Sequence, residues 1–325
     1  MQILVTGGAG YIGCHIVDLL CELGFDVIVL DNLSTGSKQN LNSKAKFVFG
    51  DITKKDELEN IFSRYSIDSI IHMAALKSVA ESMNNPTIYT ENNIVGSINL
   101  ISVAIKFKVQ KFVFSSTAAV YGNSEMEAPV DETHKVQPIN HYGYTKLYVE
   151  NYLKWISKLE HIKFVAFRYF NVAGYSTKKD LIKIKEKSPK NLLPIIMEVA
   201  NNRRASLNIF GNDYNTKDGT CIRDYIHVLD LADAHVKAIS YLDNNQSSTM
   251  NLSTGVGYSV LEAIKIAEEV TERSILYNLK ERREGDSPIL ISTFNKANRL
   301  LGWVPKYSID DIISSMWKLY KSDLK

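Results

Sequence analysis

The sequence has few cysteines, no long apolar run and almost no excess of one charge, and each lack excludes a class of protein. Three scattered cysteines and seven widely spaced histidines predict neither a disulfide framework nor a metal site. The 38 Lys and Arg nearly balance the 36 Asp and Glu, so nothing favours nucleic acid. No apolar run reaches the roughly 18 residues of a membrane span, and the turn at Gly7 comes too early for a signal peptide. We expect a soluble cytoplasmic protein that binds neither nucleic acid nor membrane.

Short apolar strands alternate with helical stretches in the first half of the 325 residues. A helix is predicted over residues 11–23 and another from about Tyr144. The predicted strands span residues 3–5, 27–30, 47–49, 70–71, 112–114 and 164–167. Continuous apolar strands separated by helices are typical of a parallel sheet covered on both faces. We predict an α/β fold with a doubly wound parallel sheet of the Rossmann type over residues 1–172.

The regular alternation fades after about residue 172. Pieces of helix mix there with short strands and loops, and they span residues 192–201, 229–242, 259–271 and 309–320. We predict a smaller mixed α/β lobe over residues 173–325, with segments that cross back to the sheet. The segment from Lys178 to Lys190 holds six lysines and is interpreted as a solvated surface loop.

A glycine-rich turn follows the first predicted strand and opens the first helix. Its glycines are Gly7, Gly8, Gly10 and Gly13. They fit the dinucleotide fingerprint, because glycine lets backbone N–H groups approach a pyrophosphate at a helix N-terminus. Asp31 ends the second strand, where a carboxylate accepts both ribose hydroxyls and repels a 2′-phosphate, so the pattern favours NAD over NADP. Asp51 ends the third strand and is predicted to lie near the adenine amino group.

Tyr142 and Lys146 are four residues apart at the start of a predicted helix, so both side chains share one face. A free tyrosine has a pKa near 10 and is a poor base at neutral pH. A neighbouring ammonium, helped by the positive charge of a nicotinamide, favours tyrosinate. Tyr142 then takes a hydroxyl proton while a hydride leaves the same carbon. Tyr144 is a weaker candidate because Tyr148, not a lysine, follows it by four residues.

A hydroxyl is needed to orient the substrate oxygen, and the fifth predicted strand supplies candidates where it ends. Ligands bind at the carboxyl edge of open α/β sheets, which is where residues 115–117 are expected. Thr117 is our first choice and Ser116 the second. The structural alternative is that these hydroxyls only cap the backbone at the strand end.

These residues carry a resemblance that runs over nearly the whole chain. The sequence resembles the extended short-chain dehydrogenase/reductase family, and most closely its UDP-glucose (UDP-galactose) 4-epimerase branch. The matching stretches are residues 6–13, 31–33, 50–51, 72–77, 92–93, 115–122, 142–146, 168–171, 210–214, 218–220, 223–228 and 283–286. The resemblance implies an isomerase that interconverts UDP-galactose and UDP-glucose through a 4-keto intermediate with bound NAD, and it implies a homodimer.

The resemblance also assigns residues to the two ligands. The implied cofactor contacts are Gly7, Gly10, Tyr11, Ile12, Gly13, Asp31, Asn32, Asp51, Ile52, Met73, Ala74, Ala75, Lys77, Asn92, Ser115, Tyr142, Lys146 and Tyr169. The implied contacts to the UDP-sugar are Lys77, Thr117, Phe170, Asn171, Asn191, Leu192, Asn208, Ile209, Phe210, Arg223, Arg283 and Asp286. Arg223 and Arg283 would clamp the diphosphate, since planar guanidinium groups suit paired anions.

Departures from the family pattern bear on the reaction and on the sugar. Ala118 and Ala119 stand where related 4,6-dehydratases place an Asp-Glu pair, and alanine cannot transfer the protons of a dehydration. Leu290 falls near the position that tunes room for the C2 substituent, so acceptance of UDP-GlcNAc or UDP-GalNAc stays a hypothesis. Residues 174–190 lack the usual loop, and Ala75 replaces a usual glycine.

Two other functions remain open for the same core. A UDP-hexuronic acid epimerase or decarboxylase needs a further cation for the sugar carboxylate. A non-catalytic NAD-sensing regulator needs no tyrosine and lysine pair, so the presence of Tyr142 and Lys146 argues against it.

Overall fold

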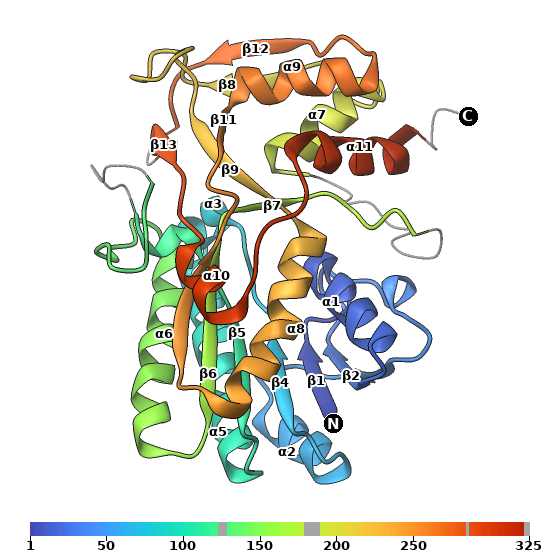
Figure 1. Ribbon diagram of the computed structural model, residues 1–325, viewed down its shortest axis with the longest axis vertical. Coiled ribbons are helices and arrows are strands. Elements are labelled where there is room, and N and C mark those ends of the chain that lie inside the picture. The colour runs from blue at the N-terminus through green and yellow to red at the C-terminus, as the bar shows by residue number, and fades with distance from the viewer. Residues whose placement is uncertain (123–128, 179–188, 284–285, 322–325) are drawn as a thin grey trace.

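The computed structural model describes residues 1–122, 129–178, 189–283 and 286–321. Its largest body is a parallel sheet in the strand order β10-β6-β5-β4-β1-β2-β3 (Figure 1). The strands are β1 (Gln2–Thr6), β2 (Asp26–Asp31), β3 (Lys46–Phe49), β4 (Ser69–His72), β5 (Lys111–Thr117), β6 (Lys163–Tyr169) and β10 (Ser248–Leu252). The predicted fold class is confirmed: this is a mixed α/β chain built on a doubly wound parallel sheet.

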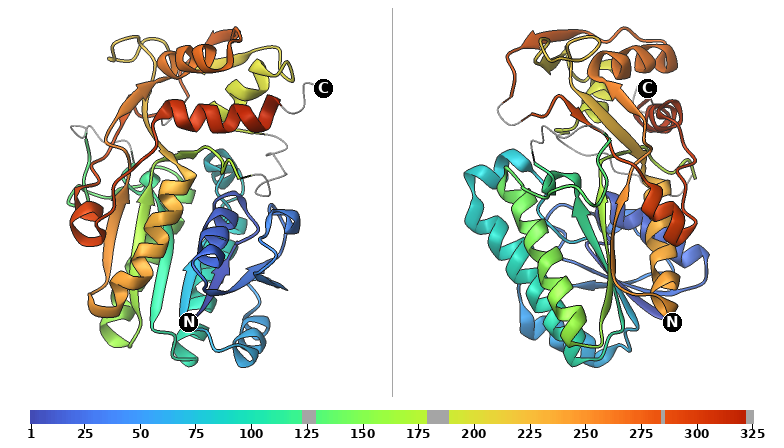
Figure 2. Two further views of the ribbon diagram at one scale, coloured as in Figure 1. Left: turned by 45° about the vertical axis from the view of Figure 1, so that its right-hand side comes forward. Right: turned by 60° about the vertical axis from the view of Figure 1, so that its left-hand side comes forward.

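Helices cover both faces of this sheet, as the right-hand view of Figure 2 shows. One face packs against α1 (Tyr11–Glu22), α8 (Val228–Asn244) and α10 (Asn295–Leu301). The other packs against α2 (Lys55–Arg64), α5 (Gly96–Lys106) and α6 (His141–Leu159). Both apolar clusters lie between a sheet face and its helices, so the strands are buried on both sides and read as continuous apolar runs.

Short elements connect β4 to α5 and β5 to α6 above the carboxyl edge of the sheet. These are α3 (Val79–Asn84), α4 (Pro86–Tyr89), the π-helical turn η2 (Thr90–Val95) and the 3₁₀ turn η3 (Ala118–Val120), with η1 (Lys38–Asn40) after β2. They place polar side chains over the ends of the central strands, where ligands bind in open α/β sheets.

The remaining elements form a smaller lobe over the same edge (Figure 1). Its strands are β7 (Asn171–Ala173), β8 (Leu207–Phe210), β9 (Ile222–His227), β11 (Gly257–Ser259), β12 (Tyr277–Lys280) and β13 (Ile289–Leu290). β9 is the centre of one small sheet, paired with β7, β11 and β13, and β8 pairs with β12. The helices α7 (Leu192–Ala200), α9 (Val260–Thr271) and α11 (Ile309–Tyr320) bury a core of their own.

The chain returns from this lobe to the large sheet. α8 begins directly after β9 and packs against α1, and β10 then adds a parallel strand beside β6. A single boundary at residue 172 therefore does not separate the two bodies completely. The elements α8, β10 and α10 come after this residue but pack on the large sheet.

The predicted helices after residue 172 are confirmed to within two residues at each end. The helix expected near Tyr144 begins earlier, at His141, because the Asn140 side chain caps it by accepting the Gly143 N–H at 2.8 Å. Most of the lysine-rich segment 178–190 lies outside the described residues. All three cysteines are free and buried. Among the described residues no helix is long and apolar enough to cross a membrane.

Candidate active site

The glycine turn between β1 and α1 is held so tightly that side chains do not fit at two of its positions. Gly7 has a φ of +69°, and a Cβ there would lie 2.6 Å from the Ala74 nitrogen. A Cβ on Gly13 would lie 2.3 Å from the Gly7 oxygen. At Gly10 the Gly7 oxygen, at 3.2 Å, is the one neighbour within 4 Å among the described residues. The turn is therefore packed on its inner side and open at Gly10, the N-cap of α1.

The N-terminus of α1 fits a phosphate group. In the described chain, no side chain caps this helix and its first turn holds no acidic residue. Its first N–H groups and its dipole therefore face an anion without competition from a capping oxygen. The structure thus brings together the predicted residues of the turn, which are Gly7, Gly10, Tyr11, Ile12 and Gly13.

Two acidic residues follow this turn along the edge of the sheet. Asp31 ends β2, and its carboxylate accepts the N–H of Ala9 at 3.0 Å and of Leu33 at 2.8 Å. Asp51 follows β3 and accepts the side-chain N–H of Asn32 at 2.9 Å. The predicted adenosine contacts therefore form one hydrogen-bonded strip beside the glycine turn, and Ile52 is buried below it against Gly96.

A buried polar chain links β1, β4 and α6. Thr6 and His72 share a hydrogen bond of 2.7 Å, His72 and Ser97 share one of 2.9 Å, and Ser97 donates to the Asn93 carbonyl. The Asn93 amide accepts the Leu76 N–H at 2.9 Å and donates to the Leu76 carbonyl at 2.9 Å and to Thr145 at 3.2 Å. This links the loop that carries Met73, Ala74, Ala75 and Lys77 to α6.

The predicted cofactor contact Asn92 and its neighbour Asn93 have different surroundings. Asn92 lies in the π-helical turn η2, half-buried, and donates to the Asn93 side chain at 2.9 Å. Asn93 is the buried member of the pair and makes the structural bonds. The sequence shows two adjacent asparagines but not which of them is buried. The backbone of the π-helical turn determines that Asn93 faces inward.

Tyr142 lies at the start of α6 and is positioned by three neighbours. Its N–H donates to the Ser82 hydroxyl of α3 at 3.0 Å, and its carbonyl accepts the Thr145 hydroxyl at 2.7 Å. The next residue, Gly143, packs so closely on η3 that a Cβ would lie 2.6 Å from the Ala119 oxygen. The Tyr142 side chain is thereby brought to the end of β5, where it hydrogen-bonds Thr117.

Lys146 lies one turn further along α6 and points at the same strand end. Its Nζ donates to the Ser115 carbonyl at 2.8 Å and lies 4.9 Å from the centroid of the Phe114 ring. Tyr169, at the end of β6, hydrogen-bonds Ser115 and lies 3.9 Å from the Met73 sulfur. The predicted residues Thr117, Tyr142, Lys146, Ser115, Tyr169 and Met73 therefore converge at the carboxyl ends of β4, β5 and β6.

The protonation of this cluster differs from what the sequence predicts. Burial raises the pKa of Tyr142 to about 12, against a smaller lowering by the Thr117 hydrogen bond. Burial also lowers the pKa of Lys146 to about 7. Desolvation disfavours both charged forms, so the chain by itself does not supply the lowered tyrosine pKa. The tyrosinate stays a prediction for the complex, in which the positive nicotinamide adds its charge.

The two candidate hydroxyls at the end of β5 have different surroundings. Ser116 is fully buried and donates to Glu150 of α6 at 2.5 Å. Thr117 bonds Tyr142 and accepts the Ala119 N–H at 3.2 Å. Alternation along the strand explains why only one of two adjacent hydroxyls reaches the site. Tyr144, the weaker rival of Tyr142, is exposed and stacks on His141.

Most of the predicted substrate contacts lie on the small lobe, where Asn171, Asn191, Asn208 and Arg283 are exposed. Arg223 of β9 forms an ion pair with Asp286 at 3.5 Å, and the Arg283 guanidinium lies 3.7 Å from the centroid of the Phe210 ring. Asn171 donates to the Asp224 carbonyl at 3.3 Å, and Asn191 is the N-cap residue of α7 without a side-chain capping bond. The remaining predicted contacts are Phe170, Leu192, Asn208 and Ile209, on or beside β7, α7 and β8.

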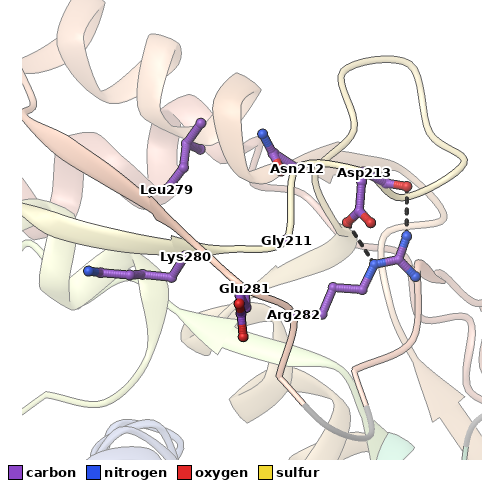
Figure 3. Close-up of a pocket in the computed structure, with 7 residues that line it drawn as sticks. All are labelled: Gly211, Asn212, Asp213, Leu279, Lys280, Glu281 and Arg282. Atoms are coloured by element: carbon purple, nitrogen blue, oxygen red, sulfur yellow. Dashed lines mark hydrogen bonds and ion pairs between the residues drawn. The ribbon is translucent and has the colours of Figure 1, made fainter.

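A separate pocket opens where β8 and β12 end (Figure 3). It is lined by Gly211, Asn212, Asp213, Leu279, Lys280, Glu281 and Arg282. Arg282 donates to the Asp213 carboxylate at 2.7 Å and to its carbonyl at 2.6 Å, as the dashed lines show. None of the predicted site residues lines this pocket, so Arg282 and its neighbour Arg283 have different surroundings. Within the described ranges, no group of three or more His, Cys, Asp or Glu is arranged to hold a metal ion.

Comparison with known proteins assigns this arrangement to a family. Residues 3–253 match the model of the NAD dependent epimerase/dehydratase family. The UDP-glucose 4-epimerase of Lacticaseibacillus casei is 44% identical over 324 residues, which cover 99% of this chain and 97% of that protein. The chain belongs to this family.

Two solved structures show how closely the fold is shared. The UDP-glucose 4-epimerase from Bifidobacterium longum, in complex with NAD+ and UDP, is 36% identical with a TM-score of 0.93, over 99% of this chain and 98% of that one. The UDP-Glc/GlcNAc 4-epimerase from Campylobacter jejuni is 40% identical with a TM-score of 0.86, over 99% of both chains. The cofactor is NAD, and the open glycine turn, the uncapped α1 and Asp31 are the features of this chain that fit it.

Proposed function

We propose that the protein is a UDP-glucose 4-epimerase, an NAD-dependent isomerase that interconverts UDP-galactose and UDP-glucose. The observation that carries this proposal is the convergence of Tyr142, Lys146 and Thr117 on one point at the carboxyl edge of the sheet. The glycine turn lies along the same edge, so a dinucleotide bound there brings its reactive end toward these side chains. We expect the cofactor to lie on the sheet and the nucleotide of the substrate to lie on the small lobe.

The roles of the three residues follow from their chemistry. The hydrogen bond between Tyr142 and Thr117 marks a place where a substrate hydroxyl can bond to both groups. Tyr142 takes the proton of the C4 hydroxyl during oxidation and returns it during reduction. Lys146 lies one turn along the same helix, and with NAD bound its ammonium and the positive nicotinamide would together favour the phenolate. Bound NAD supplies a hydride acceptor that gives the same hydride back.

The neighbours of these groups restrict the chemistry to epimerisation. Ala118 and Ala119 follow Thr117 in η3, and neither side chain has an acidic or basic group that can transfer a proton. A dehydratase needs an acid and a base at this place to remove water from the oxidised sugar. Without these two groups, the one reaction expected of the 4-keto sugar is the return of the hydride to either face of C4.

The nucleotide end holds the substrate while the sugar turns. Arg223 and Arg283 supply bidentate cationic donors for the two phosphates. Arg223 pairs with Asp286 across 3.5 Å, a long contact that a diphosphate can replace. Binding energy from this distant part lets the hexose stay loosely held and rotate above the cofactor.

The direct test is an assay of the purified protein with UDP-galactose and analysis of the product sugars. We expect UDP-glucose to form without added reductant. With UDP-galactose carrying deuterium at C4, the product is expected to keep the deuterium at C4 in ordinary water. Conversion of UDP-glucuronic acid but not of UDP-galactose would replace this proposal with the hexuronic acid alternative.

A second activity, conversion of the N-acetylated substrates, is favoured by the place of Leu290. Leu290 of β13 pairs with Arg223 in register and packs with Ala118 and Phe170, beside the end of β5. A leucine there leaves more room than a large aromatic side chain. We expect UDP-GlcNAc to be converted and a Leu290→Tyr variant to lose that activity while it keeps UDP-galactose conversion. A wild-type protein that converts UDP-galactose but never UDP-GlcNAc contradicts this second activity.

The quaternary state and the compartment are further parts of the proposal. α3 and α4 pack against α6, and these three helices expose a group of large apolar side chains. The group consists of Val79, Met83, Ile88, Tyr144, Tyr148, Trp155 and Leu159. We propose that a second copy covers this face in a cytoplasmic homodimer. Sedimentation of the wild type and of Trp155→Glu tests it, with dimer expected for the first and monomer for the second.

A further inference from the structure

A buried polar row crosses the carboxyl ends of three neighbouring strands. Ser116 of β5, Arg168 of β6 and Asn251 of β10 are register partners in the parallel sheet. Each is at most 3% exposed. Buried polar groups are costly unless they are paired, and the fold pairs all three. Arg168 lies in the matching stretch 168–171, and the resemblance assigns it no role.

Glu150 of α6 joins this row to the catalytic helix. Its carboxylate accepts Nε and Nη2 of Arg168 at 2.9 and 2.7 Å and the Ser116 hydroxyl at 2.5 Å. Burial alone would lower the pKa of Arg168, and the Glu150 carboxylate outweighs it and raises that pKa. Tyr142, Lys146 and Glu150 follow one another at intervals of four residues. The helix that carries the catalytic pair is therefore anchored to β5 and β6 by one carboxylate.

The row continues into the small lobe. Arg168 Nη1 donates to the Tyr121 hydroxyl at 3.1 Å, and Tyr121 donates to the Asn251 side-chain oxygen at 2.7 Å. The Asn251 amide then donates to the Ser292 hydroxyl at 2.8 Å. Ser292 comes two residues after Leu290. The same set of hydrogen bonds therefore reaches the segment that we expect to lie beside the sugar.

The members of the row are chain neighbours of the site. Ser116 precedes Thr117, and Arg168 precedes Tyr169, so any shift of the row moves the groups that face the substrate. A bidentate contact between a carboxylate and a guanidinium has a narrow geometry, whereas apolar contacts allow a helix to slide. The row therefore fixes α6 along β5 more sharply than packing alone.

We propose that Glu150 and Arg168 are positioning residues, which hold Tyr142 and Lys146 of α6 at working distance from Thr117 of β5. This inference rests on the proposed epimerase function. The pair touches neither ligand and acts through the placement of the catalytic groups. A misplacement of about 1 Å at a reacting group costs on the order of 100-fold in rate.

The test is the double variant Glu150→Met with Arg168→Met in the full-length protein. Replacing a buried ion pair by apolar side chains of similar volume is often neutral for folding, although Ser116 loses its acceptor, so thermal unfolding of the double variant separates stability from positioning. We expect kcat for UDP-galactose to fall about 100-fold, with KM within about twofold of wild type because the nucleotide contacts are intact. The amount of bound NAD, read from its absorbance, is expected to be unchanged.

A matched control distinguishes positioning from general damage. Asp230 is a buried carboxylate away from the row, which accepts the N–H groups of Lys306 and Tyr307 at 3.1 and 3.2 Å. Asp230→Asn is expected to lower thermal stability and leave kcat at the wild-type value. A folded double variant with wild-type kcat overturns the inference, and so does a matching loss of kcat in the Asp230→Asn variant.

A milder variant decides the case if the double variant does not fold. Tyr121→Phe removes one hydroxyl between Arg168 and Asn251 and is expected to lower kcat about fivefold without a change in KM. A folded Tyr121→Phe protein with wild-type kcat then overturns the inference. Wild-type protein without epimerase activity refutes the proposed function, whereas active wild type with unaffected variants refutes only the positioning role.

Discussion

The two ends of the candidate site are built in different ways. At the carboxyl edge of the sheet, Thr117 and Lys146 are buried, and hydrogen bonds hold the strand ends and α6 in one arrangement. On the small lobe, Arg223 makes one long ion pair and Arg283 lies exposed over a ring. One end is held by buried hydrogen bonds, and the other presents cationic groups that suit an anion.

This difference suits an epimerase. The reacting groups gain from being held in place, because misplacement costs rate. The diphosphate contacts supply binding energy far from the reacting carbon, and that energy need not fix the hexose. The comparison therefore predicts that substitutions at the sheet edge lower kcat, whereas substitutions on the small lobe raise KM.

The largest effect is expected at Tyr142. Tyr142→Phe keeps the ring and removes the hydroxyl that transfers the proton, so kcat is expected to fall about 1,000-fold with little change in KM. Steady-state rates with UDP-galactose measure it. Tyr144→Phe, two residues along the same helix but exposed, is the matched control and is expected to keep wild-type turnover. Full activity in Tyr142→Phe would remove this residue from the mechanism.

The opposite pattern is expected at Arg283. Arg283→Ala removes a charged donor to the diphosphate, so KM for UDP-galactose is expected to rise about 30-fold while kcat changes little. Arg282→Ala is the control, because that neighbouring guanidinium already pairs with Asp213 beside the separate pocket. Equal effects in the two variants, or a loss confined to kcat, would contradict the division of roles between the two ends.

A smaller effect on the cofactor is expected at Asp31. Asp31→Asn keeps the size of the side chain and removes the charge that repels a 2′-phosphate. NAD affinity is expected to fall about tenfold, the effect of one charge-assisted hydrogen bond. Titration of cofactor-free protein with NAD and with NADP measures both affinities. An unchanged preference for NAD over NADP would show that Asp31 does not contact the adenosine ribose.

The smallest effect is a pH dependence of stability caused by Lys146. Its pKa is about 7 in the folded chain and has its ordinary value of 10.5 in the unfolded chain. Between these values the unfolded state binds more protons, so stability rises with pH. From about pH 7 to 8 the cofactor-free wild type is expected to gain about 1 kcal/mol over Lys146→Met. Denaturant unfolding at both pH values measures it, and a constant or falling difference would show that Lys146 is not a desolvated cation.

The sequence predicted the layout of the sheet because apolar strands and glycine stops are local signals. It also predicted which residues gather at the carboxyl edge, since parallel strands end together. Thr117 was ranked ahead of Ser116, and the alternation of side chains along β5 gives the physical reason for their different surroundings. The structure brings Thr117 to Tyr142 and turns Ser116 toward Glu150.

Long-range register was out of reach of the sequence. Arg168 meets Glu150 and Asn251 only because β6 lies between β5 and β10, and β10 comes from the far half of the chain. The raised pKa of Tyr142 in the chain alone was also out of reach, because spacing on a helix says nothing about desolvation. Spacing likewise gives no sign that Arg223 pairs with Asp286.

The account depends most on where Tyr142 lies relative to the reacting carbon. The direct measurement is a crystal structure of the protein with NAD and UDP-glucose bound. The account predicts the Tyr142 hydroxyl oxygen at about 3 Å from the C4 oxygen of the hexose, with Arg223 and Arg283 on the diphosphate. A complex with both arginines engaged and Tyr142 beyond hydrogen-bonding reach of the C4 oxygen would contradict it.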